Sequence, residues 1–404
     1  HTFTMPLNAY IVEAVRTPAG RNRGALSKWH AADLGAVVVD AILDRTKIDP
    51  AAVDDVIFGC VSQIGSQAGN VARNVVLSSK LPESVPGTSV DRQCGSSQQA
   101  IHFAAQAVMS GTQDVVICGG VETMSSVPIG SNVMDGMQAG RGNPMSKGIQ
   151  KRYPGVAMFS QFQGAEMVAE KWDIARVEME KMALESHQRA FQATKKGYFK
   201  KEIVPVVGFN KKTKEEFKMD KDEGIRPTVT LEKMAKLPPL RGGRITAACA
   251  SQISDGAAAL LIVNENGLKK LGLKPRARIV SLAVAGDDPV MMLSAPIPAT
   301  RKVLKQSGMS LADMDLYEVN EAFASVPLAW AKDLGADRSK LNVNGGAMAL
   351  GHPLGGTGAK LMTTLLHELE RRGKRFGLQA ICEGGGTANA TIIEVLPQGL
   401  KSKL

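Results

Sequence analysis

Aromatic side chains, paired cysteines and long apolar runs are all scarce in this sequence. Phe, Trp and Tyr make up 4% of the 404 residues, and no basic run alternates with aromatic residues as in a base-stacking surface. No apolar stretch approaches the roughly 20 residues that span a bilayer, and the N-terminus has no secretory signal pattern. The sequence therefore predicts neither a nucleic-acid partner nor a membrane span.

The cysteines argue against a metal centre and a disulfide framework. Their number is odd, none occurs in a C-x-x-C pair, and they are spread along the chain as Cys60, Cys94, Cys118, Cys249 and Cys382. Metal sites and small disulfide-rich domains need closely spaced or even-numbered cysteines. The pattern predicts no metal site and indicates reduced thiols in an intracellular compartment.

The charge is basic, with 49 Lys and Arg against 39 Asp and Glu and a formal net charge of +10. A polyanion is the expected partner, and charge alone does not separate a nucleic acid from a nucleotide-bearing thioester. Length and a hydrophobic content of 44% predict two or three domains with a sizeable core.

An internal repeat is the strongest organisational feature. Four segments of the first part match four of the last part in character: 9–18 with 277–286, 47–63 with 308–324, 87–111 with 341–369, and 114–122 with 378–386. Each copy alternates apolar strands with long helices. The repeat predicts an α/β protein with two covered mixed sheets, packed pseudo-symmetrically. The stretch 124–250 lacks the repeat, shows helical patterns at 164–172 and 176–194, and is interpreted as an insertion.

Cys94 stands between a predicted strand and a predicted helix in "DRQCGSSQQA". A helix N-terminus lowers the pKa of a thiol and offers N–H groups to an oxyanion. The alternative is a buried cysteine that acts only as a small hydrophobe. The small polar neighbours favour the nucleophile.

His352 lies in "GHPLGGTGAK", a glycine-rich turn before a helix. The spacing fits neither a phosphate loop nor a dinucleotide fingerprint. We interpret the glycines as room for a substrate beside the imidazole, and the alternative is a turn histidine without a role. His367, among charged residues, is expected at the solvated surface, and His30, His102 and His187 are expected to be structural.

Two further segments carry polar or reactive groups at predicted strand ends. Cys382, before three glycines in "CEGGG", is placed to exchange a proton with a substrate. Its repeat counterpart Cys118 is assigned to packing. Asn320 in "YEVNEAFAS" either orients a water and polarises a carbonyl or caps the next helix, and both interpretations stay open.

With "DRQCGSSQQA", "NEAFA", "GGAMALGHPLGGTGAK" and "CEGGG" in this order, the chain from about residue 8 to residue 396 resembles the thiolases. The resemblance implies two similar βαβαβαββ halves in five layers (αβαβα) with an inserted loop domain. It implies a first half at 5–123, completed by 251–275, a CoA-covering insertion at 124–250, a second half at 276–397 and a tail at 398–404.

The resemblance also implies chemical roles. Cys94 would take the acyl group as a thioester, His352 would activate it, and Cys382 would move the proton at the α-carbon. Asn320 would hold an oxyanion-hole water together with His352. The backbone amides of Cys94 and Gly384 would form a second oxyanion hole. Two thiols and one imidazole suffice for ping-pong acyl transfer.

The CoA contacts implied by the resemblance are Arg226, Ser251, Ala322 and Phe323. The chain departs from short-chain biosynthetic thiolases at Lys233, where a serine is common, and in 157–172, which lacks a His-Met pair. It also has Cys249 where many members have Asn. The departures favour a degradative 3-ketoacyl-CoA thiolase of wide range over an acetoacetyl-CoA thiolase of the biosynthetic direction. A non-catalytic protein that binds CoA or lipid is the remote alternative.

Partners and location follow from the resemblance and the C-terminus. The expectations are CoA as a substrate, no tightly bound cofactor, and a homodimer or homotetramer. The final Ser402-Lys403-Leu404 is a peroxisomal address if the source is eukaryotic, and the cytoplasm is expected otherwise.

Overall fold

The computed structural model describes residues 7–397, so the predicted tail at 398–404 and its C-terminal address lie outside the described residues. Ten strands form one hydrogen-bonded sheet, in which nine follow the order β10-β11-β12-β9-β1-β8-β5-β3-β4 and β2 pairs with β8. Their bounds are β1 Tyr10–Arg16, β2 Gly20–Arg21, β3 Asp55–Gly59, β4 Gly87–Val90, β5 Val115–Thr123, β8 Ser254–Val263, β9 Ala277–Gly286, β10 Leu316–Val319, β11 Phe376–Glu383 and β12 Thr387–Val395.

The repeat is visible in the strand pairing. β3 is parallel to β5, β5 is antiparallel to β8, and β8 is antiparallel to β1. In the second half β10 is parallel to β11, β11 is antiparallel to β12, and β12 is antiparallel to β9. The two sheets meet where Tyr10 and Ile11 of β1 pair with Arg278 and Ala277 of β9. The prediction of two similar α/β halves is confirmed.

The second copy differs from the first at one predicted strand. Where the first half has β4, the second has only an isolated parallel bridge between Tyr317 and Leu341. Asn342 turns the backbone to a φ of 46°. Its side-chain amide then exchanges two hydrogen bonds of 2.9 Å with the N–H and C=O of Val319. The side chain replaces the backbone ladder, so no strand is needed there.

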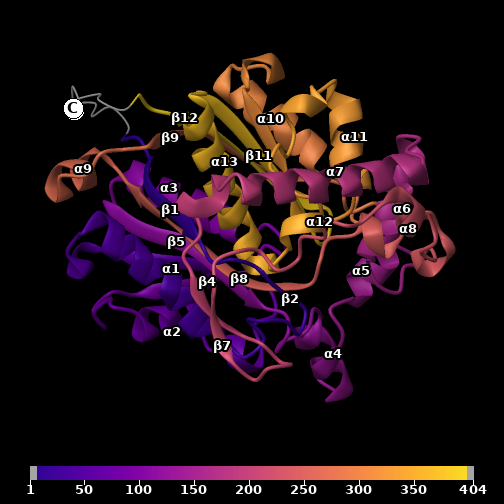
Figure 1. Cartoon of the computed structure of the whole chain (residues 1–404), viewed down its shortest axis with the longest axis horizontal. Coiled ribbons are helices and arrows are strands. Elements are labelled where there is room, and N and C mark those ends of the chain that lie inside the picture. The colour runs from indigo at the N-terminus through magenta and orange to yellow at the C-terminus, as the bar shows by residue number, and fades with distance from the viewer. Residues whose placement is uncertain (1–6, 398–404) are drawn as a thin grey trace.

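Helices cover the sheets in five layers (Figure 1). α1 (Ala31–Thr46) and α2 (Val71–Ser78) pack on the outer face of the first sheet, and α10 (Pro296–Ser307) lies on the outer face of the second beside α11 (Ser325–Leu334). Between the sheets lie α3 (Ser96–Ser110) and α13 (Thr357–Arg372). The remaining helices are α4 Ser131–Gln138, α5 Lys147–Arg152, α6 Gln161–Lys171, α7 Arg176–Lys195, α8 Leu231–Ala235, α9 Glu265–Leu271 and α12 Ala347–Leu350.

The central layer explains why the expectation for His367 was wrong. Residues 357–369 of α13 are all buried, because a sheet covers each side of the helix. His367 donates from Nε2 to the carbonyl of Ala14 in β1 at 3.0 Å. Burial lowers the pKa of His367 to about 3, so the ring is neutral. Of the charged residues near it in sequence, Glu368 is buried as well, and Arg371 and Arg372 belong to the exposed end of the helix.

The structure agrees with the expectations for Cys118, His102 and His30 and for the helices of the middle segment. Cys118 is fully buried in β5, and His102 is buried between α3 and β12, bonded to Thr391. His30 caps α1 by accepting from the N–H of Ala32. The helical patterns of the middle segment correspond to α6 and α7, while the hairpin of β6 (Val206–Phe209) and β7 (Glu216–Met219) was not predicted.

A buried ion-pair cluster ties the middle segment to the first sheet. Arg16 of β1 contacts Glu202 at 2.7 Å and Asp222 at 2.8 Å. Lys360 of α13 lies near Asp222 and donates to the carbonyls of Leu350 and Gly351. The same cluster therefore also supports the turn that precedes His352.

The glycines after His352 serve a different purpose from the expected one. A Cβ at Gly355 would lie 2.6 Å from Cys60 Cα and 2.7 Å from the carbonyl oxygen of Gly59. A Cβ at Gly358 would lie 2.2 Å from the N–H nitrogen of Gln98. These glycines let the backbones of the two halves touch. They make the turn fit the other half rather than leave room for a substrate.

Glu122, at the end of β5, holds this contact. Its buried carboxylate accepts from the N–H groups of Val61, Ser62 and Gly355 at 2.8–3.0 Å and from the side chain of Gln67 at 2.8 Å. Burial raises the pKa of Glu122, while these bonds favour its ionised form. Three chain segments are thus joined by one carboxylate.

Glu122→Gln is expected to destabilise the protein by about 1–3 kcal/mol. The new NH₂ group cannot accept a hydrogen bond, so at least one backbone N–H that now donates to Glu122 would lose its partner. Glu215→Gln is the control, since that side chain is exposed next to β7 and the exchange is chemically the same. Urea unfolding of both variants checks this. Equal midpoints for the two would contradict the role of Glu122.

Candidate functional site

Cys94 is presented by a tight elbow (residues 91–95) between β4 and α3. Gln93 has a φ of 49°, a left-handed conformation that a non-glycine residue adopts only when its surroundings enforce it. The N–H of Gln93 donates to Asp91 Oδ1 at 2.8 Å, and Ser96 Oγ donates to the Gln93 carbonyl at 2.5 Å. The strained backbone is therefore held by Asp91, at the start of the elbow, and by Ser96, directly after it.

The expectation of a lowered thiol pKa at Cys94 was wrong. α3 begins at Ser96, with Gly95 as its N-cap, so the thiol precedes the helix. The side chain packs against Val61, Met124 and Leu354. Burial raises the pKa of Cys94 to about 12, and the nearby carboxyl of Glu383 adds to the effect. The thiol is protonated at neutral pH and needs a base to become a nucleophile.

His352 has the tautomer that a base requires. Its Nδ1 lies 2.6 Å from Thr357 Oγ1, and that hydroxyl donates its single proton to the Pro353 carbonyl at 3.0 Å. The hydroxyl must therefore accept from Nδ1–H, which leaves the lone pair on Nε2. Burial and the charge of Lys360 lower the pKa of His352 to about 3. The ring is a neutral proton acceptor.

Asn320 contacts the other side of that ring. Its Nδ2 donates to His352 Nε2 at 3.3 Å, and its own N–H donates to the Ala380 carbonyl at 3.0 Å. The buried Oδ1 atom has no hydrogen-bond partner among residues 7–397. Because an unsatisfied buried acceptor is costly, this oxygen suits a water or a substrate N–H. Asn320 does not cap α11, whose N-cap is Ala324.

Cys382 and Glu383 end β11 next to the elbow. Burial raises the pKa of Cys382 well above the usual value, and a thiolate at Cys94 would raise it further, because the two sulfur groups are near one another. Glu383 Oε2 accepts from Thr387 at 2.7 Å, while the buried Oε1 has no partner among the described residues. A Cβ at Gly95 would lie 1.9 Å from this Oε1. Gly95 is therefore required for Glu383 to reach the elbow.

Gly384 lies on the same side of the elbow. A Cβ there would meet the side-chain oxygen of Gln93 at 2.8 Å. Gly385 and Gly386 follow with φ values of 81° and 77°, which turn the chain into β12. The structure thus brings Cys94, Cys382 and Gly384 to one elbow, and His352 joins them through Leu354, which packs against Cys94.

The predicted CoA contacts line or flank a cleft of about 400 Å³. Arg226 and Lys233 are at its exposed part, and the N–H of Arg226 donates to His187 Nδ1 at 3.1 Å. Gln252 lines it too, and its carbonyl accepts from the N–H of His352 at 3.1 Å. The cleft therefore leads from two cations toward His352.

The other three predicted contacts form the wall beside this cleft. The N–H of Ser251 donates to the Ala322 carbonyl at 2.9 Å, and Ala250 forms a bridge with Phe323. Ala322 and Phe323 are buried, and Ser251 is partly exposed. Of the three, only Ser251 is placed to contact a ligand through its side chain.

Sequence reasoning missed Thr357, Gln252 and Glu383. Thr357 stands five residues after His352 in the same motif, and Glu383 directly follows Cys382, so both lie in segments that had been recognised. The Thr357 hydroxyl fixes a tautomer within one turn, and the Glu383 carboxyl packs on Gly95 of another segment, and no sequence pattern reveals either contact. Gln252 carried no signal at all.

No helix among residues 7–397 has the length and apolarity to cross a membrane. Within the same residues, no group of three or more His, Cys, Asp and Glu side chains is arranged to hold a metal ion.

Comparison with known proteins gives consistent matches over nearly the whole chain. Residues 9–266 match the N-terminal domain of thiolases and residues 273–395 match the C-terminal domain. The steroid 3-ketoacyl-CoA thiolase FadA6 of Mycobacterium tuberculosis is 56% identical over 391 residues, covering 96% of this chain and 94% of its own. A 3-ketoacyl-CoA thiolase of Serratia proteamaculans is 44% identical over 400 residues, covering 96% and 99%.

Solved structures give the same fold. The acetyl-CoA acetyltransferase of Bacillus anthracis superposes with a TM-score of 0.87 at 38% identity, covering 97% of this chain and 99% of that one. Human mitochondrial 3-ketoacyl-CoA thiolase superposes with a TM-score of 0.86 at 40% identity, covering 96% and 99%.

Glu383→Gln is expected to change the reactivity of Cys94 only at alkaline pH. Burial raises the pKa of Glu383 to about 8, against the opposing charge of Arg92, so the carboxyl is neutral below that pH. Above it the carboxylate opposes thiolate formation at Cys94 and Cys382. The variant should therefore be alkylated by iodoacetamide at Cys94 faster than the wild type above about pH 8, and equally fast below about pH 7.

Peptide mass spectrometry across the pH range measures the alkylation of Cys94. Glu232→Gln, on the exposed surface of α8, is the control and should match the wild type throughout. Coincident profiles for Glu383→Gln and wild type would show that this carboxyl does not act on the nucleophile.

Proposed function

Because the chain belongs to the thiolase family, we propose that it is a degradative 3-ketoacyl-CoA thiolase. This acyltransferase cleaves a 3-ketoacyl-CoA with CoA into acetyl-CoA and a shortened acyl-CoA. The observation that carries the proposal is the 56% identity to a steroid 3-ketoacyl-CoA thiolase over almost the full length of both chains. The same observation supports a ring-bearing acyl group as the substrate class.

The first half-reaction transfers the acyl group to Cys94. His352 Nε2 takes the thiol proton, and the sulfur attacks the keto carbon of the substrate. The bond between that carbon and the α-carbon then breaks, and the electron pair goes to the α-carbon as an acetyl-CoA enolate. Cys382 gives its proton to this carbon, which releases acetyl-CoA and leaves a thioester on Cys94. Burial of Cys382 suits this role, because its raised pKa keeps the proton available.

The second half-reaction releases the shortened product. The Cys382 thiolate takes the proton of an incoming CoA thiol, whose sulfur attacks the thioester. Cys94 leaves and receives its proton back from His352. The unpartnered Oδ1 of Asn320 is suited to hold the water that contacts the first oxyanion with His352. The amides of Cys94 and Gly384 serve the second oxyanion.

CoA binding is assigned to the cleft that ends at Gln252. Arg226 and Lys233 match the phosphates or the adenine of CoA in charge, and the pantetheine arm passes Ser251 toward His352. Ala322 and Phe323 shape the wall behind it. CoA is the substrate of this cleft, and no tightly bound cofactor is required by the chemistry.

Organisation and location are part of the proposal. The first half comprises residues 5–123 with 251–275, the CoA-covering insertion comprises 124–250, and the second half comprises 276–397. The chain assembles as a homodimer or homotetramer. Relatives from bacteria such as Serratia proteamaculans favour the cytoplasmic alternative over the peroxisomal one.

The second candidate is an acetoacetyl-CoA thiolase in the biosynthetic direction. The similarity to an acetyl-CoA acetyltransferase favours it, and the TM-scores of 0.87 and 0.86 do not separate the two activities. A non-catalytic CoA-binding role is disfavoured, because every catalytic residue of the resemblance is present.

Thiolysis rates for acetoacetyl-CoA and for longer 3-ketoacyl-CoAs test the function. We expect a higher kcat/KM for the longer substrates, since 157–172 lacks the short-chain features. A sharp preference for acetoacetyl-CoA would establish the second candidate instead.

Acyl labelling tests the residue roles. Cys382→Ala should stop turnover, because no group protonates the α-carbon, yet it should accept an acyl group from a simple acyl-CoA at Cys94. Mass spectrometry of the Cys94 peptide detects the added acyl mass. Cys118→Ala, a buried cysteine of β5, is the control and should turn over normally. An acyl label on Cys382 in the wild type would reverse the two roles.

A further inference from the structure

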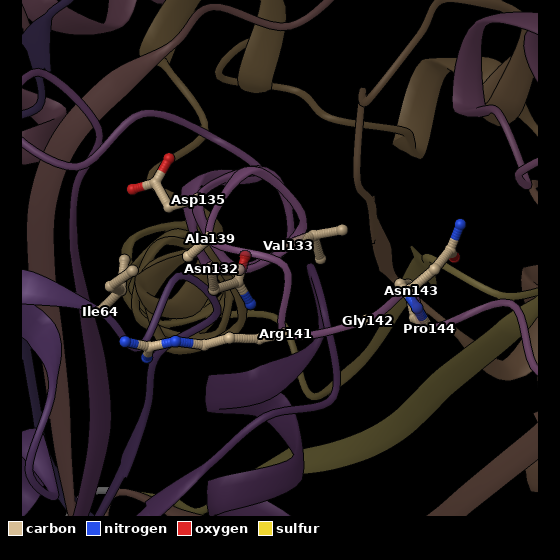
Figure 2. Close-up of a pocket in the computed structure, with 10 residues that line it drawn as sticks. Ile64, Asn132, Val133, Asp135, Ala139, Arg141, Gly142, Asn143 and Pro144 are labelled. Atoms are coloured by element: carbon tan, nitrogen blue, oxygen red, sulfur yellow. The ribbon is translucent and has the colours of Figure 1, made fainter.

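Two cavities of the structure differ in the residues that line them. The cavity under α4 has a volume of about 650 Å³ and is lined by Ile64 and by residues between 132 and 144, as Figure 2 shows. The cleft of about 400 Å³ is lined instead by Arg226, by Met348 of α12 and by Gln252. The last of these is bonded to the turn of His352, so this cleft has a direct connection to the base.

The main chain of Gln252 holds the segment 347–352. Its N–H donates to the Ala347 carbonyl at 3.5 Å, and its carbonyl accepts from the N–H of His352 at 3.1 Å. Both groups belong to the backbone, so a change of the side chain leaves them in place. The side chain of Gln252 therefore serves a separate purpose.

This side chain joins α12 to a second segment. Its Nε2 donates to the Met348 carbonyl at 2.6 Å and to the Gly224 carbonyl at 2.9 Å. Both partners only accept hydrogen bonds, so the nitrogen of the amide, and not its oxygen, must face them. The two protons of Nε2 are thereby both used, one for α12 and one for the loop 222–230.

The loop 222–230 packs directly on α12. A Cβ at Gly224 would lie 2.5 Å from Gln252 Oε1 and 2.9 Å from the carbonyl oxygen of Ala349, so only glycine allows this approach. The loop forms neither helix nor strand, and Arg226, which it carries into the lining of the cleft, is exposed. The position of the loop over the cleft therefore depends on bonds such as that from Gln252 to Gly224.

We propose that the side chain of Gln252 is a positioning group that clamps the loop of Arg226 to the segment of His352. CoA that binds Arg226 through its nucleotide then has its thioester end fixed relative to the imidazole. The binding energy of the nucleotide is in this way used at the reacting carbon. The inference rests on the proposed function, and it adds the residue that connects the binding end of the cleft to the reacting end.

Gln252→Met tests the clamp, because methionine has a similar length and no N–H donor in its side chain. The two substrate pairs are acetoacetyl-CoA with CoA, and acetoacetyl-pantetheine with pantetheine, which lacks the nucleotide and so cannot engage Arg226. The variant should lower kcat/KM for the CoA pair by about tenfold or more and leave the pantetheine pair within about twofold. A residue that merely supported the fold would lower both values alike.

A second variant tests whether Gln252 acts through the nucleotide end. Arg226→Gln should lower the ratio of the two kcat/KM values as well. The double variant should lose little more than the weaker of the two single variants, because both changes act on one interaction. The controls are Gln113→Met, a half-buried glutamine two residues before β5, and Arg141→Gln in the cavity under α4, and both should keep the wild-type ratio.

Two results would overturn the clamp. Equal losses for the CoA and pantetheine pairs would make Gln252 a support of His352 alone, and an unchanged ratio together with unchanged rates would remove its role. Failure of the proposed function has a different appearance, since the wild type would then cleave neither substrate. Titration calorimetry would in that case still compare the binding of CoA and pantetheine, and Gln252→Met should weaken only the binding of CoA.

Discussion

The site depends on the carboxylate of Glu122, which binds N–H groups of two segments, residues 61–62 and Gly355, at the interface of the two halves. Each apolar neighbour of the nucleophile adjoins one of these bonds. Val61 donates its own N–H, Leu354 precedes the donor Gly355, and Met124 follows Glu122 by two residues. The surface on which Cys94 rests is therefore positioned by one buried carboxyl group and by glycines that allow the backbones to touch.

Burial then decides the chemistry, because the same low-polarity surroundings act on every titratable group. They raise the pKa of both thiols and lower the pKa of His352. Cys94, Cys382 and His352 are therefore all neutral in the resting protein. In the proposed mechanism, charge appears only when a proton moves from Cys94 to His352, and the Oδ1 of Asn320, which has no partner among residues 7–397, lies beside the ring on which it appears.

The sequence predicted the two-half architecture well, since strand and helix periodicity repeats along the chain, and its motifs named the residues that meet at the site. It failed where neighbours in space decide. His367 looks exposed in sequence but lies between two sheets, and the thiol of Cys94 looks activated but has a raised pKa. The strand expected at 341 is replaced by the side chain of Asn342, which no periodicity reveals.

The position of β8 has a consequence for how the chain folds. β8 lies between β1 and β5, and it pairs Val263 with both Tyr10 and Val115. The first sheet therefore cannot close until the whole middle segment has been synthesised. Until then β1 and β5 expose unpaired edges, and such long-range pairing is slow and prone to aggregation. Folding of the first half is thus delayed by the segment inserted into it, and nascent chains need protection over that interval.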